Sequence, residues 1–174
     1  FQGLDIARFN IDSNKEIEKV IEELDKVEKP ALCFCFIDPF SINIHFNTIQ
    51  KLASKYRMDF LILFASDMDL RRNHTLYSDE KDTRVSQQLG DNNWREDYRK
   101  KYTHTPQNLI KYVSETYIEK MKSIGYDHSH HEAISNKERN RILYHLIFFS
   151  KHKLGKKFAT ISSSYSDNQI GFNL

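Results

Sequence analysis

Two short runs of apolar residues stand out in the first part of the chain. Residues 31–37 read ALCFCFI, and residues 59–65 read DFLILFA. An uninterrupted apolar run is typical of a parallel strand that is covered on both faces. Helical spacing of apolar positions predicts a helix between them, from about Ile42 to Tyr56. Because strand, helix and strand follow one another closely, the sequence predicts a βαβ unit in an open α/β sheet, with these two strands paired in parallel at its centre and helices on both faces.

A further helix is predicted ahead of this unit, from about Ser13 to Lys26. Ser13 and Glu16 have the spacing of a capping box. One apolar face follows from the positions of Ile17, Val20, Ile21, Leu24 and Val27. Because proline breaks a helix, this one should end before Lys29-Pro30.

The sequence pattern of the carboxyl-terminal part predicts one long helix followed by a β-hairpin. Thr105-Pro106 is a helix start signal, and an apolar stripe runs from Gln107 to Ile124, where Gly125 ends it. Two extended segments, 126–134 and 141–149, are joined by a short polar turn, so they should pair antiparallel. Residues 66–105 are highly charged and predict an insertion or long loop within a single domain that spans residues 1–174.

Composition narrows the classes of function. The chain has 39% hydrophobic and 29% charged residues, and no apolar run reaches the roughly 20 residues that span a bilayer. Its net charge of +2 does not by itself predict nucleic-acid binding. Cys33 and Cys35 should share one face of a strand, roughly 6 to 7 Å apart, which is poor disulfide geometry. Reduced thiols are therefore expected, as in a cytoplasmic protein without a membrane partner.

The motif Asp38-Pro39-Phe40 stands at the carboxyl end of the first predicted strand, where open α/β sheets bind ligands. A polar side chain followed by proline and an aromatic can accept hydrogen bonds from the exocyclic amine of a base, while the aromatic stacks on that base. A second interpretation stays open, because Asp38 or Ser41 could instead cap the helix that follows.

Four segments, taken in their order along the chain, resemble the sequence of a known protein family. They read FIDPFSI, RMDFLILFASDMDLRRN, the pair Trp94-Arg95, and LYHLIFFSKHKLGKKF. In this order and spacing the chain resembles the three-Cys-motif partner (TcmP) family over roughly residues 31–160. It departs from the family at Ser41, where members have glycine, at Ala159, where they have tryptophan, and in having one proline where base amino-methyltransferases have two.

The resemblance implies the carboxyl-terminal half of a class I, Rossmann-like methyltransferase fold. It implies a methyltransferase-like protein that acts on nucleic acid or a nucleotide-like substrate, with Asp38, Pro39 and Phe40 as catalytic residues and a cysteine-cluster protein as partner. S-adenosylmethionine would be the cofactor of the complete protein. The chain has five glycines, none in a G-x-G arrangement, so we expect no S-adenosylmethionine binding by this chain alone. The alternative is a non-catalytic module that binds protein or nucleic acid.

Three polar residues, Arg71, Arg72 and Asn73, follow the second predicted strand and could meet a phosphate or carboxylate at the same edge. Local pairing with Asp67 and Asp69 is the alternative.

Two other segments could bind an anion or a base. Trp94 opens a segment that interleaves aromatic and basic residues, which suits either base stacking or a solvated helix face. Lys151 opens the one concentrated basic patch, which could contact an anion or simply protect a sheet edge. His128 and His130 would share a strand face, but nothing nearby completes a metal site.

Overall fold

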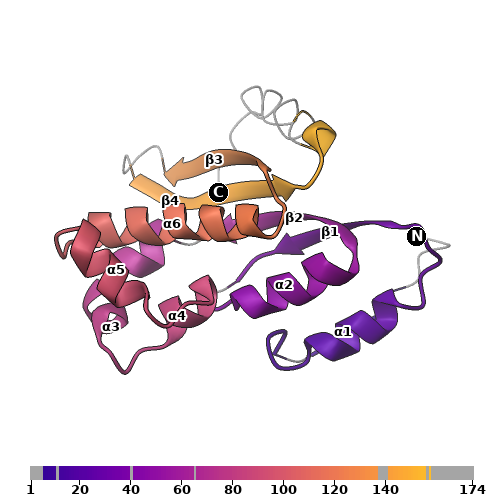
Figure 1. Cartoon of the computed structure of the whole chain (residues 1–174), viewed down its shortest axis with the longest axis horizontal. Coiled ribbons are helices and arrows are strands. Elements are labelled where there is room, and N and C mark those ends of the chain that lie inside the picture. The colour runs from indigo at the N-terminus through magenta and orange to yellow at the C-terminus, as the bar shows by residue number, and fades with distance from the viewer. Residues whose placement is uncertain are drawn as a thin grey trace.

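The computed structural model describes residues 6–10, 12–39, 41–64, 66–136, 141–155 and 157. A four-stranded sheet in the order β1-β2-β4-β3 forms its centre (Figure 1). The strands are β1 (Leu32–Ile37), β2 (Arg57–Phe64), β3 (His128–Asn136) and β4 (Arg141–Ser150).

The two apolar runs pair in parallel, as predicted, but the expectation that both are central strands is wrong for β1, which lies at one edge of the described sheet. Residues 32–37 of β1 lie opposite residues 57–62 of β2 in an unbroken register. The predicted hairpin is also confirmed, because β3 and β4 pair antiparallel. β4 is antiparallel to β2 as well, with Phe149 opposite Phe60. The sheet is therefore mixed, and the turn at residues 137–140 lies outside the described residues.

One face of the sheet carries the core. Helices α2 (Phe46–Lys55) and α6 (Pro106–Ser123) pack against it. Every second residue of β2 is buried there, and Tyr117 of α6 contacts both Phe64 and Phe149. The period of two follows from strand geometry, because successive side chains point to opposite faces.

The opposite face is open along β1, so the expectation of helices on both faces is wrong for this strand in the described part of the chain. Leu32, Phe34 and Phe36 are 81%, 60% and 56% exposed. In Figure 1, α1 and α2 lie on one side of β1. An apolar run alone cannot report that one of its two faces is uncovered.

The first two helices begin later than predicted. α1 runs from Ile17 to Leu24, and no side-chain hydrogen bond caps it, so the predicted capping box does not form. Asp12 instead accepts a hydrogen bond from the backbone N–H of Asn14 at 2.9 Å in a turn ahead of the helix. α2 begins at Phe46, and the preceding residues 41–45 form a loop.

Residues 66–105 are helical rather than a long loop. They form a π-helical turn, η1 (Ser66–Leu70), and three helices, α3 (His74–Ser78), α4 (Arg84–Leu89) and α5 (Trp94–Lys101). Their buried residues belong to the same hydrophobic cluster as the sheet and include Leu70, Tyr77, Val85, Leu89, Trp94 and Tyr98. Each helix contributes only one or two such residues, so no long apolar stripe marks this region in the sequence.

The start and end of α6 agree with the prediction. The Thr105 hydroxyl accepts a hydrogen bond from the Asn108 backbone N–H at 3.2 Å, and Pro106 occupies the first turn. Gly125 follows the helix with a φ of +94°, a conformation that favours glycine. None of the helices in the described part of the chain is both long and apolar enough to cross a membrane.

The two cysteines are free thiols in β1, as expected. Burial, and to a lesser degree the neighbouring Cys33, raises the pKa of Cys35 to about 11. Cys35 is therefore a protonated thiol at neutral pH and is poorly suited to nucleophilic chemistry.

Two buried tyrosines of the core allow a matched test of hydrogen bonding. The Tyr117 hydroxyl has no hydrogen-bond partner in the described part of the chain, whereas the Tyr126 hydroxyl donates to the Met58 carbonyl oxygen at 2.8 Å. We expect Tyr117→Phe to raise the free energy of unfolding by about 1 kcal/mol and Tyr126→Phe to lower it by about 1 kcal/mol. Urea denaturation of the two variants measures both changes. Equal destabilisation by both would contradict the unpaired state of the Tyr117 hydroxyl.

Candidate functional site

Asp38 and Pro39 open the loop that follows β1. The Asp38 side chain is exposed, and within the described part of the chain no hydrogen bond or ion pair engages its carboxylate. Asp38 thus presents a free acceptor at the carboxyl end of a parallel strand, the edge at which open α/β sheets bind ligands. Phe40, the third residue of the motif, lies outside the described residues.

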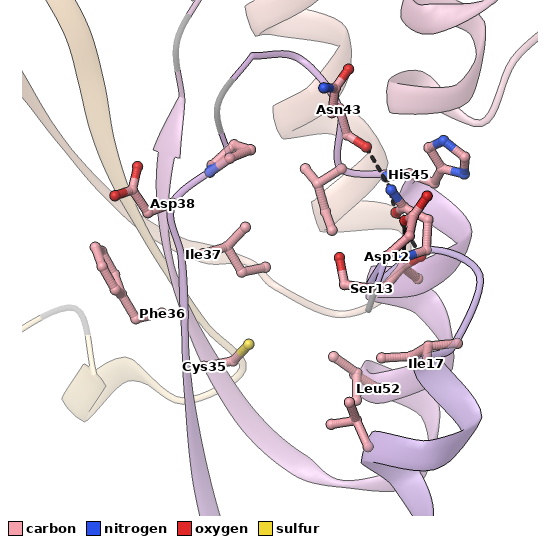
Figure 2. Close-up of a pocket in the computed structure, with 15 residues that line it drawn as sticks. Asp12, Ser13, Ile17, Cys35, Phe36, Ile37, Asp38, Asn43, His45 and Leu52 are labelled. Carbon is pink, nitrogen blue, oxygen red and sulfur yellow. Dashed lines mark hydrogen bonds between the residues drawn. The ribbon is translucent and has the colours of Figure 1, made fainter. Parts of the chain in front are cut away.

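The capping interpretation of Asp38 and Ser41 is contradicted by where α2 begins. The N-cap residue is His45, and its side chain makes no capping hydrogen bond. The first turn is held instead by Asn14, whose Oδ1 accepts from the His45 backbone N–H at 2.9 Å and from the Thr48 hydroxyl at 3.0 Å (Figure 2). A residue from ahead of α1 therefore supplies the cap of α2.

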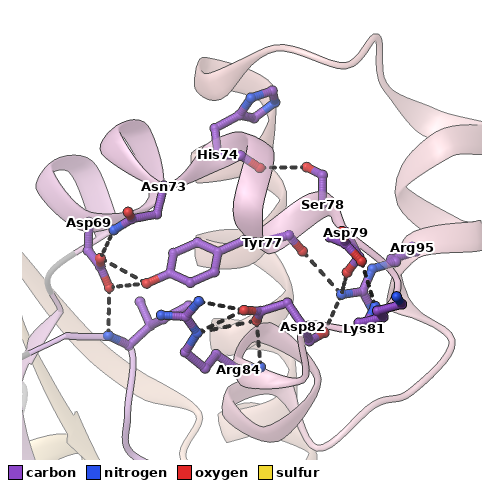
Figure 3. A network of polar contacts seen from close by, with 11 residues as sticks. Asp69, Asn73, His74, Tyr77, Ser78, Asp79, Lys81, Asp82, Arg84 and Arg95 are labelled. Carbon is purple, nitrogen blue, oxygen red and sulfur yellow. Dashed lines mark hydrogen bonds and ion pairs between the residues drawn. The ribbon is translucent and has the colours of Figure 1, made fainter.

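The loop after β1 is fixed to the segment after β2 by one carboxylate. Asp69, in η1, accepts a hydrogen bond from the Ile42 backbone N–H at 2.9 Å. It also accepts from the Tyr77 hydroxyl at 2.8 Å and from the Asn73 side-chain amide at 2.6 Å (Figure 3). Both strand ends and α3 are thereby joined at a single side chain.

The Tyr77 hydroxyl stays protonated at neutral pH and can therefore donate a hydrogen bond. Burial, followed by the hydrogen bond to Asp69, raises the pKa of Tyr77 well above its ordinary range. The guanidinium of Arg84 lies 4.4 Å from the centroid of its ring, a cation–π distance. Tyr77 therefore has a structural role at neutral pH.

Arg95 fixes the loop between α3 and α4. Its guanidinium donates to the carbonyl oxygens of Tyr77 at 3.1 Å, of Asp79 at 2.6 Å and of Asp82 (Figure 3). One side chain thus satisfies a carbonyl group in the last turn of α3 and two carbonyl groups of the loop that follows it. This residue is therefore committed to the fold of the helical region.

A cavity of about 710 Å³ lies between β1 and α1 and extends to the carboxyl end of the strand (Figure 2). Its rim includes Asp12, Ser13 and His45, and its apolar wall includes Cys35, Ile37 and Leu52. The Asp38 side chain lies on the other side of β1, the side that also carries the exposed ring of Phe36 (Figure 2). A carboxylate on the same side of a strand as an exposed aromatic ring suits a flat, amine-bearing ring, because binding sites commonly join apolar surfaces to a few polar anchors.

The rim residues from the α1 side were not predicted. Asp12, Ser13 and Asn14 precede Asp38 by more than 20 residues in the sequence. They reach the cavity because the Asn14 side-chain amide donates to the Asn43 carbonyl oxygen at 2.8 Å, in addition to the cap described above. A polar Asp-Ser-Asn turn was the only signal, and it is common ahead of any helix.

The three polar residues after β2 that could bind a phosphate or carboxylate differ in their surroundings. Asn73 donates to Asp69, so the local-pairing interpretation holds for Asn73. Arg71 is half-buried and Arg72 is exposed, both directly after η1. Ser41 is half-buried in the loop next to Ile42.

Trp94 and Lys151 lie away from Asp38. Trp94 is 1% exposed, and its indole N–H donates to the Ser86 hydroxyl at 3.1 Å, so its ring is covered by the core. Lys151 follows β4 and thus lies toward the amino end of β2, the opposite end of the sheet. Its ammonium donates to the Ala53 carbonyl oxygen at 2.8 Å and lies 5.0 Å from the centroid of the Tyr126 ring.

The chain matches no model of a known protein family, no curated protein and no solved structure. Among the described residues, no group of three or more histidine, cysteine, aspartate or glutamate side chains is placed to hold a metal ion. The candidate site is therefore defined by the free Asp38 carboxylate and the exposed Phe36 on the same side of β1.

Stability measurements on two variants test whether Asn14 or Asp38 caps α2. We expect Asn14→Ala to lower the free energy of unfolding by about 1 to 2 kcal/mol, because the His45 N–H and the Asn43 carbonyl lose their partner. Asp38→Ala should change it by less than about 0.5 kcal/mol, as at other exposed positions. Thermal and urea unfolding measure both values. A clear loss of stability in Asp38→Ala would restore the capping interpretation.

The pair of His74 and His104 predicts a pH dependence of stability. Burial, and then the nearby His104, hold the pKa of His74 below its usual 6.5, and the two rings lie 4.6 Å apart. The unfolded chain therefore binds this proton at a higher pH than the native protein, so stability is lost as the pH falls below 6.5. Between pH 7.5 and 5.5, the wild type should lose more unfolding free energy than His74→Gln. Parallel losses in the two proteins would show that His74 does not carry this dependence.

Proposed function

We propose that this chain is the substrate-binding part of a methyltransferase-like α/β protein of the three-Cys-motif partner type, and that it binds a nucleotide-like ligand carrying an exocyclic amine. The observation that carries the proposal is the free Asp38 carboxylate at the end of β1, on the same side of the strand as the exposed ring of Phe36. Ligands in open α/β sheets bind at this edge.

The chemistry of the site favours an amine. A carboxylate without a partner is an acceptor only, and it gains a charge-assisted hydrogen bond from an N–H donor. The ring of Phe36, which is 56% exposed and lies on the same side of β1 as the Asp38 side chain, offers a surface against which a base can stack (Figure 2). Phe40 stays a predicted stacking residue, and Pro39 sets the direction of the chain between it and Asp38.

The end of the fold supports the resemblance. A helix followed by an antiparallel hairpin is how a class I methyltransferase sheet finishes, and α6 followed by β3 and β4 has this form. This likeness concerns the fold, so the ligand is argued from Asp38 and Phe36. A cysteine-cluster protein as partner is a proposal that follows from the resemblance alone.

The described residues do not fit S-adenosylmethionine. A site for it requires a glycine-rich turn between a strand and a helix. The described glycines lie elsewhere, with Gly90 after α4, Gly125 after α6 and Gly155 after β4. The loop from Asp38 to His45 has no glycine. We therefore assign no step of methyl transfer to these residues and restrict the proposal to ligand binding.

Fluorescence anisotropy with labelled oligonucleotides tests the proposal. Oligo-dA and oligo-dC carry exocyclic amines, whereas oligo-dI and oligo-dT lack them and serve as matched controls. We expect tighter binding of the amine-bearing strands and loss of that preference in Asp38→Ala, by about tenfold or more for a charge-assisted hydrogen bond. Asp38→Asn should keep part of the preference, because the amide retains an acceptor oxygen.

Equal affinity for all four oligonucleotides, or an unchanged preference in Asp38→Ala, would rule out the amine site. Phe40→Ala should weaken all four by the loss of stacking, about 1 to 3 kcal/mol. The unfolding measurements on Asp38→Ala described above ensure that a binding defect is not a folding defect.

A second candidate function is favoured by one separate observation. The exposed apolar side of β1 suits a module that binds another polypeptide, because large apolar patches rimmed by polar residues mark interaction surfaces.

A further inference from the structure

A second cavity lies at the end of the sheet opposite Asp38. Its volume is about 520 Å³, and it lies where β1 and β2 begin and β4 ends. Leu32, Met58 and Leu154 belong to its apolar wall. Sites for small molecules have volumes of about 300 to 1,000 Å³, so this cavity has the size of a ligand site.

The segment after β4, yellow in Figure 1, is folded tightly at this cavity. The buried Ser150 hydroxyl donates to the His152 carbonyl oxygen and accepts from the His152 backbone N–H, both at 3.0 Å. The Gly155 backbone N–H donates to the same carbonyl oxygen at 3.0 Å. A Cβ atom at Gly155 would overlap the Ser150 side chain, so glycine is required for this close approach. The turn therefore holds His152 and Leu154 at the wall of the cavity.

Two donors at the cavity have no acceptor in the described part of the chain. Arg57 is exposed, and no hydrogen bond or ion pair engages its guanidinium there. The Nδ1 atom of His152 accepts a hydrogen bond from the Leu154 backbone N–H at 3.2 Å. A neutral imidazole that accepts at Nδ1 carries its proton at Nε2. Among the described residues this Nε2 N–H has no partner, and both Arg57 and His152 line the cavity.

The charges around the cavity favour an anion. Lys151 also lines it, and its ammonium is held in place because it donates to the Ala53 carbonyl oxygen at 2.8 Å. Asp59, which is half-buried, is the only acidic residue among the described residues that line the cavity, so Arg57 and Lys151 outweigh it. A guanidinium presents a planar fork of N–H donors that matches the oxygens of a carboxylate or a phosphate.

This cavity is distinct from the open edge of β1. Arg57 and Asp59 belong to β2, which has β1 and β4 as its neighbours in the described sheet. His152 and Leu154 follow β4, which lies between β2 and β3. A strand added beside β1 would therefore not pair with the strands that carry these groups.

We propose that this cavity binds a small anion in which a carboxylate or phosphate group is attached to an apolar body. Arg57 binds the anionic oxygens through charge-assisted hydrogen bonds, and the Nε2 N–H of His152 donates a further one. Leu32 and Leu154 are 81% and 61% exposed and cover the apolar body, because burial of exposed apolar surface is favourable. The basic segment that begins at Lys151 thus contributes to a ligand site.

Isothermal titration calorimetry with three naphthalene compounds tests the proposal. 1-Naphthyl phosphate and 1-naphthoate carry the two anionic groups, whereas 1-naphthol has the same ring without the charge. We expect at least one of the two anions to bind about tenfold or more tightly than 1-naphthol, as for a hydrogen bond to a charged group. The tighter of the two identifies the anionic group. Inorganic phosphate should bind far more weakly than either, because it lacks the apolar body.

Protein variants locate the contact. Arg57→Gln should reduce the affinity for the preferred anion to about that of 1-naphthol. Lys153→Gln is the matched control, because Lys153 is exposed in the same basic segment but is not among the residues that line the cavity, so the affinity should not change. Both variants replace exposed side chains, so their melting temperatures should stay close to that of the wild type. Amide chemical shifts in NMR spectra should change mainly at residues 57–59 and 150–155.

Four results would overturn the proposal. Equal affinity for the three naphthalene compounds, or shifts centred on Phe34 and Phe36, would indicate a general apolar surface. Equal losses in Arg57→Gln and Lys153→Gln would indicate a diffuse basic patch. Inorganic phosphate that binds as tightly as the naphthalene anions would indicate an adventitious ion only, and absence of binding by both anions would exclude the site. The inference does not rest on the amine site, so the oligonucleotide and naphthalene measurements can fail separately.

Discussion

The arrangement at the carboxyl ends of β1 and β2 depends on the carboxylate of Asp69. It accepts hydrogen bonds from a backbone N–H of the loop after β1, from the side-chain amide of Asn73 and from the hydroxyl of Tyr77. Without it, the Ile42 N–H would lose its partner beside a fully buried side chain, which is costly. The hydrogen bond from Tyr77 to the same carboxylate joins α3 to η1, so the loop after β1 and the helical region share one anchor.

The strands and the last helix could be predicted because their signals are local. The runs around Cys35 and Phe60 are strands, and Thr105-Pro106 begins α6. The open face of β1 could not be predicted, because an apolar run does not report which face is covered. The helices of residues 66–105 were missed because each buries only a few aromatic or aliphatic side chains, such as Tyr77 and Trp94, among charged neighbours.

The candidate site was predictable in part. Asp38 followed from its position at a strand end, but the cap of α2 came from Asn14, a residue 31 positions before His45. Such long-range side-chain contacts leave no periodic trace in the sequence. Trp94 shows the opposite case, because its neighbourhood of basic residues suggested a base-stacking surface although the ring packs in the core.

The unequal edges of the sheet also bear on the stoichiometry of any assembly formed through main-chain pairing. Growth of a sheet into a filament needs two receptive edges on every unit, so that each new unit offers a fresh edge to the next. Within the described residues, the edge strand β3 carries histidines and a glutamate, whereas β1, at the other edge, is apolar throughout. The described sheet therefore offers one apolar edge rather than two, and main-chain pairing between such units would stop after a single joint.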